Sequence, residues 1–185
     1  TWSFLYLVQE RSFTGLESGF AGMLQWIGAG LGAGLGGLLA DRMATKIGYR
    51  WGYRLVPMIS LPLAGLLLLL AVSVSAPYAA VLALMATFFM IELNEGPFWA
   101  ATMRVARSDT GAATGVLNTG GNFAGMVSAP VIGALSGAGN WNATFVIGAA
   151  FAFVGAACWL AIDPDRRVVS APSAPPPDPP SPQAA

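Results

Sequence analysis

The sequence predicts an all-α integral membrane protein, and three observations support this class. Hydrophobic residues make up 55% of the 185 residues and charged residues only 10%, against about 25% in a typical soluble domain. Long apolar stretches recur between short polar segments, and a helix that crosses a membrane needs about 20 mainly apolar residues. The stretches are continuous rather than alternating, which disfavours barrel strands. Helices are expected, because each one satisfies its own backbone hydrogen bonds in lipid.

Five complete membrane helices are expected within residues 19–163. Their apolar spans are 19–40, 55–74, 78–103, 111–135 and 142–162. A charged loop at 41–54, a short turn at 75–77, a polar loop at 104–110 and a glycine-rich turn at 136–141 separate them. Asp163 and Pro164 end the last span, because proline does not continue a helix smoothly.

The two ends of the chain are expected to differ from this helical block. Residues 1–8 are apolar but too short to span, as the end of a truncated helix would be, and residues 9–18 form an external polar loop. Because the sequence begins at Thr1 in such a stretch, we expect it to be part of a longer protein. Residues 164–185 are rich in proline, which predicts a disordered tail. This tail is either a solvated terminus or a segment that recruits a proline-binding partner.

The basic residues predict the orientation in the membrane. If the five spans alternate in direction, three segments fall on one side, and they hold eight of the nine Lys and Arg residues: Arg42, Lys46, Arg50, Arg54, Arg104, Arg107, Arg166 and Arg167. Arg11 lies on the other side. Because basic loops face the cytoplasm, we expect a multi-pass protein of the inner or plasma membrane with a cytoplasmic C-terminus.

The composition argues against several classes of function. The chain has no His and a single Cys158, so no metal site, disulfide or His-assisted catalysis is expected. A formal net charge of zero gives no basic face for nucleic acid. The glycine run at 28–37 lacks the Lys-Ser/Thr of a phosphate loop and lies in an apolar span. Its glycines at 28, 32 and 36 instead predict a smooth face for a neighbouring helix. No cofactor is expected, and an enzyme is disfavoured.

A first candidate site lies where the first complete span meets its charged loop. Gly37 would let two helix ends approach closely, and Asp41 and Arg42 follow at the membrane surface. Such an acid and base can pair with a neighbouring helix and separate when the helices rock. The alternative is an ordinary basic loop.

A second candidate site lies in the fourth span. Asn118 and Asn122 are four residues apart, so they share one helix face. Carboxamides in lipid are costly unless they bond to another helix or to a substrate. Both alternatives, helix packing and substrate binding, stay open on these residues alone.

A third candidate site lies inside the third span, where Gly96 and Pro97 are expected to interrupt the helix. Glu92 and Glu95 are three residues apart and broadly share a face. In a low dielectric, two such acids can hold an exchangeable proton between them, which suits proton coupling. Alternatively, one acid lies at the membrane edge or pairs with an Arg outside this chain.

Two of these motifs resemble a known family. GGLLADRMATKIGYR at 36–50 resembles the cytoplasmic signature loop of the major facilitator superfamily, although Ala44 stands where the family often has Gly. GVLNTGGNFAGMVSAPVIG at 115–133 resembles helix 11 of its anion:cation symporter branch, which includes hexuronate, galactonate, glucarate, tartrate and phthalate permeases and sialin. The resemblance covers residues 1–163. It implies the C-terminal six-helix half, helices 7–12, of a twelve-helix fold, with the first helix truncated.

The resemblance also implies a function. It indicates a secondary active transporter, a symporter of an organic anion such as a sugar acid, driven by H⁺ or else Na⁺. Its partners are the lipid bilayer and the missing N-terminal half, where this branch generally keeps its coupling acids and its substrate-binding Arg. Aromatic residues of helix 10 line the cavity in some members, which makes Phe98 and Trp99 substrate-binding candidates beside Asn118 and Asn122. Two alternatives stay open: a drug or metabolite exporter, and a non-transporting membrane scaffold.

Overall fold

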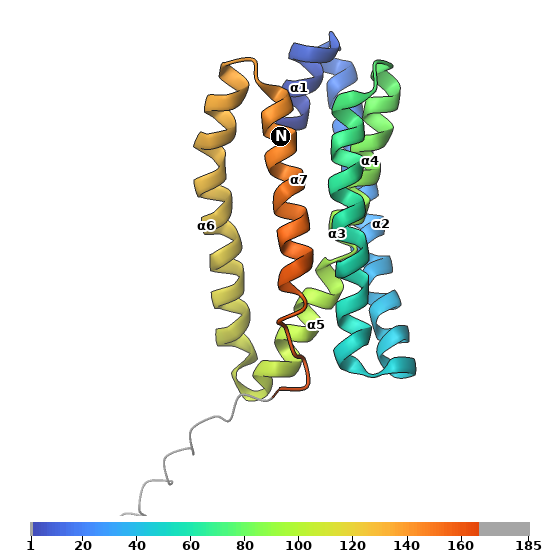
Figure 1. Ribbon diagram of the computed structural model, residues 1–185, viewed down its shortest axis with the longest axis vertical. Coiled ribbons are helices and arrows are strands. Elements are labelled where there is room, and N and C mark those ends of the chain that lie inside the picture. Colours follow the sequence, from blue (N-terminus) through green and yellow to red (C-terminus); the bar gives the residue numbers. More distant parts are fainter. Residues whose placement is uncertain (1, 167–185) are drawn as a thin grey trace, which may run out of the picture.

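The structure is a computed structural model that describes residues 2–166, and its regular secondary structure within that range consists of helices (Figure 1). Its elements in order are α1 (Trp2–Arg11), α2 (Gly15–Ile47), α3 (Tyr49–Ser73), α4 (Pro77–Glu92), α5 (Glu95–Ala106), the 3₁₀ turn η1 (Arg107–Asp109), α6 (Thr110–Gly137) and α7 (Trp141–Cys158). No strand is found in the described range, so the predicted all-α class is confirmed.

Four helical stretches in the described range are long and apolar enough to cross a membrane. They are Gly15–Ile47, Tyr49–Ser73, Pro77–Gly137 and Trp141–Cys158. The third stretch contains α4, α5, η1 and α6, and the chain reverses direction near η1 (Figure 1). This stretch therefore holds two of the five expected spans, one made by α4 with α5 and the other by α6.

The predicted charged loop at 41–54 is wrong. Helix α2 continues through it to Ile47, and α3 begins at Tyr49, so that Gly48 alone joins them with a φ of 87°. Such a positive φ favours glycine. Small residues make the sharp reversal feasible, because a Cβ added at Gly52 would overlap the backbone of Ala44. The charged side chains therefore project from helix ends.

The expected external loop at 9–18 is also shorter in the structure. Helix α1 runs to Arg11 and α2 begins at Gly15. Thr14 caps α2, because its side chain accepts a hydrogen bond from the Glu17 backbone while the Glu17 carboxylate accepts one from the Thr14 backbone. This reciprocal capping box satisfies the free donors of a helix start and places the start four residues before the predicted span.

The third predicted span is broken one turn earlier than expected. Helix α4 ends at Glu92 and α5 begins at Glu95, with a tight turn in which the Asn94 backbone N–H donates to the Ile91 carbonyl at 3.1 Å. Pro97 is the third residue of α5, where its missing N–H is tolerated because helix starts leave such donors free. Gly96 and Pro97 thus lie in the first turn of α5 rather than at the break itself.

The contact between α2 and the broken helix runs along one row of glycines. A Cβ at Gly28 would lie 2.9 Å from the Met85 carbonyl oxygen. At Gly32 and Gly36 a Cβ would overlap the carbonyl oxygens of Phe89 and Leu93 respectively. We call the row Gly28, Gly32 and Gly36 the glycine seam. The prediction that these glycines form a helix-contact face is confirmed.

Two groups of buried side chains hold the bundle together at its two ends. One group, around Tyr6, Leu7, Leu84, Trp141 and Phe145, joins α1, α4 and α7. The other, around Ala40, Tyr53, Val56, Leu93 and Trp159, lies at the end that carries the α2–α3 turn. Helix α6 takes part in neither group. It packs mainly against α5 and α7, and within it only Ser136 is buried (Figure 1).

The start of the predicted proline-rich tail is ordered against the bundle. Pro164 is fully buried, and Asp163 and Asp165 form ion pairs with α3 and α5. The remainder of that tail, from Arg167 onward, lies outside the described residues, and its predicted disorder stays a prediction.

The glycine seam predicts a stability difference between neighbouring glycines of α2. Gly36→Ala places a methyl group against the Leu93 carbonyl and is expected to lower the free energy of unfolding by about 1–3 kcal/mol. Gly34→Ala is the matched control, because nothing lies within 4 Å of a Cβ there and alanine favours a helix by about 0.5–1 kcal/mol. Thermal unfolding in detergent measures both. Equal effects of the two substitutions would contradict the seam.

Candidate functional site

The break between α4 and α5 holds two acids in contact with the bundle interior. Glu92 ends α4 and Glu95 begins α5, and both are partly buried. The Glu95 carboxylate accepts a hydrogen bond of 2.6 Å from the indole nitrogen of Trp99, one turn along α5. Glu92 lies against the glycine seam, since its Cβ would be 3.2 Å from a Cβ at Gly32. The hydrogen bond from Trp99 therefore holds the Glu95 side chain in place.

Asn94 adds an unsatisfied acceptor to the same turn. Its side-chain oxygen is buried and, within residues 2–166, has no hydrogen-bond partner. A buried polar atom without a partner costs about 1–3 kcal/mol. The turn thus concentrates three polar side chains, two of them ionisable, in the middle of an apolar stretch.

The predicted gate residues lie farther along α2. A Cβ at Gly96 would be 2.5 Å from the Gly37 Cα, so α2 and α5 touch at this glycine pair. The Asp41 carboxylate accepts a hydrogen bond from the Tyr53 hydroxyl of α3 at 3.3 Å. Arg42 is exposed and has no ion pair in the described part of the chain. The structure therefore joins Asp41 to its own bundle and leaves Arg42 accessible.

The two predicted carboxamides lie on α6 and are both exposed. The side-chain nitrogen of Asn122 donates to the Asn118 carbonyl within the same helix at 2.8 Å. No hydrogen bond within residues 2–166 involves the Asn118 side chain or the Asn122 side-chain oxygen. Packing against another helix of the described bundle therefore does not account for either residue.

The two predicted aromatic residues of α5 point in different directions. Phe98 packs toward the bundle interior, with its ring 6.4 Å from the ring of Trp159 between centroids. It lines a cavity of about 290 Å³ between α5, α6 and the segment after α7, together with Leu117 of α6. Trp99 instead turns toward Glu95. The candidate residues of α4, α5 and α6 thus form two groups, one around the helix break and one on α6, and no hydrogen bond in the described range joins these two groups.

One polar cluster was missed by the sequence reasoning. The segment after α7 is tied to the ends of α3 and α5 by the pairs Arg50–Asp163 at 3.9 Å and Arg104–Asp165 at 3.2 Å. Arg54 donates to the Ile162 carbonyl, and the Arg104 guanidinium stacks 3.4 Å above the Tyr49 ring. These arginines had served only to predict orientation. The signal in the sequence was that Asp163 and Asp165 fall on the side of the membrane that holds most of the basic residues, where they can form ion pairs.

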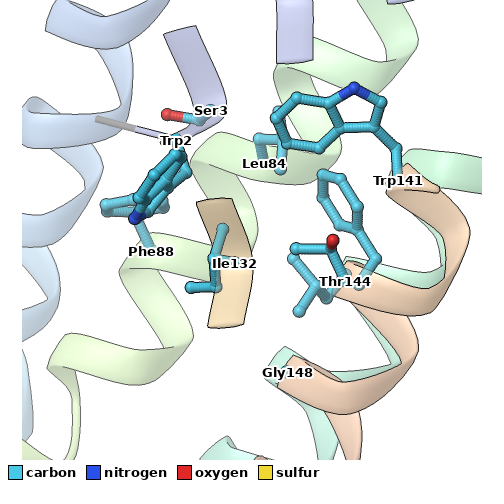
Figure 2. A pocket seen from close by; sticks show the side chains of 10 residues that line it. Trp2, Ser3, Leu84, Phe88, Ile132, Trp141, Thr144 and Gly148 are labelled. Carbon is cyan, nitrogen blue, oxygen red and sulfur yellow. The ribbon is translucent and has the colours of Figure 1, made fainter. Parts of the chain in front are cut away.

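A further cavity of about 330 Å³ lies between α1, α3, α4, α6 and α7 (Figure 2). Aromatic and aliphatic side chains line most of it, including Trp2, Phe88, Ile132 and Trp141. The Ser3 hydroxyl at its edge donates to the side-chain oxygen of buried Gln25 at 2.7 Å. This lining therefore offers few hydrogen-bond donors or acceptors to a polar ligand.

Comparison with known proteins decides the family. The sequence matches the Major Facilitator Superfamily over residues 1–184. The chain belongs to the major facilitator superfamily. Together with its apolar helices, this membership makes it a multi-pass membrane protein.

Among curated proteins, the chain is similar to the probable sulfoacetate transporter SauU of Cupriavidus necator. The two are 38% identical over 86 residues, which is 46% of this chain and 20% of the relative. The match thus spans about a fifth of the relative's length. No group of three acidic, His or Cys residues suited to a metal occurs in the described range of this major facilitator chain.

The Trp99–Glu95 hydrogen bond predicts a stability effect for this major facilitator bundle. Trp99→Phe keeps an aromatic ring but leaves the partly buried Glu95 carboxylate without its donor, and is expected to cost about 1–3 kcal/mol. Trp26→Phe is the control, because Trp26 is 62% exposed and should change stability by less than about 0.5 kcal/mol. Thermal unfolding in detergent is the measurement, and an equal loss for both substitutions would contradict this role.

Proposed function

We propose that this chain is the C-terminal half of a secondary active transporter that carries small organic anions. The family to which it belongs supports transport. The relative named for sulfoacetate supports an anionic substrate, because sulfoacetate carries a carboxylate and a sulfonate. The anion would bind between two halves, and rocking of the halves would open the site to each side in turn.

The exposed carboxamides of α6 carry this proposal. Asn118 and Asn122 lie on a membrane-spanning helix, yet the Asn118 side chain and the Asn122 oxygen have no partner in the described bundle. Polar side chains at membrane depth face a cavity or a partner, because lipid cannot satisfy them. A face of α6 turned toward a second half-bundle and a water-filled cavity meets this requirement. There the carboxamide N–H groups can donate to the oxygens of an organic anion.

The helix break supplies the second element of the proposal. Glu92 and Glu95 lie on either side of the turn, and we assign them to coupling with H⁺, with Na⁺ as the alternative ion. The hydrogen bond from Trp99 orients the Glu95 carboxylate. Trp99 and Phe98 would contribute apolar walls to the substrate path, with Phe98 on the side of α7.

The gate and the orientation belong to the same proposal. Gly37, Asp41 and Arg42 would stabilise one gate state, with Arg42 free to pair across to the other half. The basic ends of α2 and α5 lie at the same end of the bundle as the segment after α7 (Figure 1). This clustering supports a cytoplasmic C-terminus in the inner or plasma membrane, because positively charged segments stay in the cytoplasm.

Uptake into proteoliposomes that contain the complete carrier tests the substrate class. Sulfonated and carboxylated small anions are expected to accumulate in a saturable way. Asn118→Ala removes a hydrogen bond to a charged ligand, worth about 1.5–3 kcal/mol, so the KM should rise roughly tenfold or more. Val116→Ala on α6 is the control, because Val116 is 75% exposed and has no polar group.

Two results would overturn this assignment. One is the absence of saturable uptake for every anion, which removes the substrate class. The other is an unchanged KM in Asn118→Ala, which removes Asn118 from the binding site.

Coupling through the helix break has its own prediction. Glu92→Gln keeps the shape of the side chain but cannot carry a proton between two charge states. We expect it to abolish uphill uptake driven by a proton gradient, while substrate exchange between equal compartments continues. Uptake with and without the gradient, and counterflow, are the measurements. Full gradient-driven accumulation in both Glu92→Gln and Glu95→Gln would show that the coupling acids lie elsewhere.

A further inference from the structure

A small polar cavity lies at the end of the bundle opposite the Arg104–Asp165 ion pair. It has a volume of about 170 Å³ and is lined by Tyr6, Glu10, Arg11, Val72, Trp141 and Asn142. These residues come from the end of α1, the end of α3 and the start of α7. The cavity plays no part in the proposed transport site, which uses the helix break and α6.

Trp141 gives this cavity an unsatisfied donor. The residue is only 3% exposed, and its indole nitrogen has no hydrogen-bond partner within residues 2–166. Trp141 lines both this polar cavity and the larger apolar one. Figure 2 shows the nitrogen on the ring edge turned away from Thr144 and Ile132, which line the apolar cavity. A ligand acceptor in the polar cavity would remove the cost of this buried donor.

Arg11 gives the cavity a fixed positive charge. Its Nε donates to the Tyr6 hydroxyl at 2.8 Å. One terminal nitrogen donates to the carbonyls of Ala71 and Val72, at 2.9 and 3.2 Å, where α3 is ending. These bonds hold the guanidinium in place and, within the described range, leave the other terminal nitrogen for a ligand. The start of α7 at Trp141 adds the positive end of a helix dipole.

Glu10 makes the cavity unsuitable for a simple anion. Arg11 and the exposed Glu10 both line the cavity, yet neither side chain forms an ion pair within residues 2–166. A free anion would be attracted by Arg11 and repelled by Glu10. A ligand with a negative and a positive group a few ångströms apart matches both charges.

We propose that this cavity binds the headgroup of a phospholipid that carries a phosphate and a primary ammonium, as phosphatidylethanolamine does. The phosphate oxygens would accept from Arg11 and from the Trp141 indole nitrogen, with the exposed Asn142 amide beside them. The ammonium would donate to the Glu10 carboxylate, which a quaternary ammonium without N–H groups cannot do. The position fits a lipid, because Trp side chains gather where helices meet the membrane surface.

Lipid binding to the purified chain tests this site, with native mass spectrometry as the readout. Phosphatidylethanolamine should bind more tightly than phosphatidylcholine or phosphatidylglycerol of the same acyl chains. Trp141→Phe keeps an aromatic ring, although a smaller one, and removes the donor, so it should weaken phosphatidylethanolamine binding roughly fivefold or more. Trp159→Phe is the matched control, because Trp159 is also 3% exposed but lies at the other end of α7, and it should keep the affinity.

Glu10→Gln provides a second variant at an exposed position that does not threaten folding. It should lower the preference for phosphatidylethanolamine over phosphatidylglycerol severalfold, while phosphatidylglycerol binds at least as well as before. Three results would overturn the proposal: equal binding of the three lipids, an unchanged preference in Glu10→Gln, and competition by millimolar inorganic phosphate that displaces the lipid. The last result would assign the cavity to a free oxyanion. Transport assays do not enter this test, so its outcome is independent of the proposed function.

Discussion

The close backbone contact between α2 and the broken helix is the constraint on which the rest of this bundle depends. Along the glycine seam, the carbonyl oxygens of Met85, Phe89 and Leu93 lie where side chains would otherwise stand. The Leu93 carbonyl belongs to the turn between α4 and α5. Two helices can approach this closely only where the facing residues lack a Cβ. Helix α2 therefore supports the turn directly, and the turn positions the two acids.

This support explains why polar groups can sit at membrane depth in α4 and α5. The turn is covered on one side by α2 and, through Leu93, by the group of buried residues around Tyr53 and Trp159. Irregular backbone is tolerated in a membrane only where protein or a cavity surrounds it. Glu95 is further held by Trp99. Helix α6 has no comparable cover, and its carboxamides are left for contacts beyond the described bundle.

Polar contacts fix the two ends of the bundle in different ways. At one end, the segment after α7 is tied to α3 and α5 through Asp163 and Asp165. At the other end, Arg11 from α1 binds the last carbonyls of α3, next to the start of α7. In both places charged side chains bind polar groups near helix ends, which apolar side chains cannot do. The second end retains an unsatisfied Trp141 donor and an unpaired Glu10 among the described residues, which is what distinguishes it as a ligand site.

Composition and spacing alone determined the membrane class, the helical secondary structure and the contact face of the glycine seam, because each depends on properties local to one helix. The motifs at 36–50 and 115–133 indicated the family by their resemblance to its known motifs. Tertiary structure decided the rest. It extended α2 through the expected loop, since Gly52 and Ala44 allow a one-residue reversal, and moved the break to Leu93 and Asn94, where the carbonyl meets Gly36. It also turned Phe98 toward Trp159 and left the Trp141 indole without a partner among the described residues. These outcomes depend on which helices pack against each other, and that is set by residues far apart in the chain.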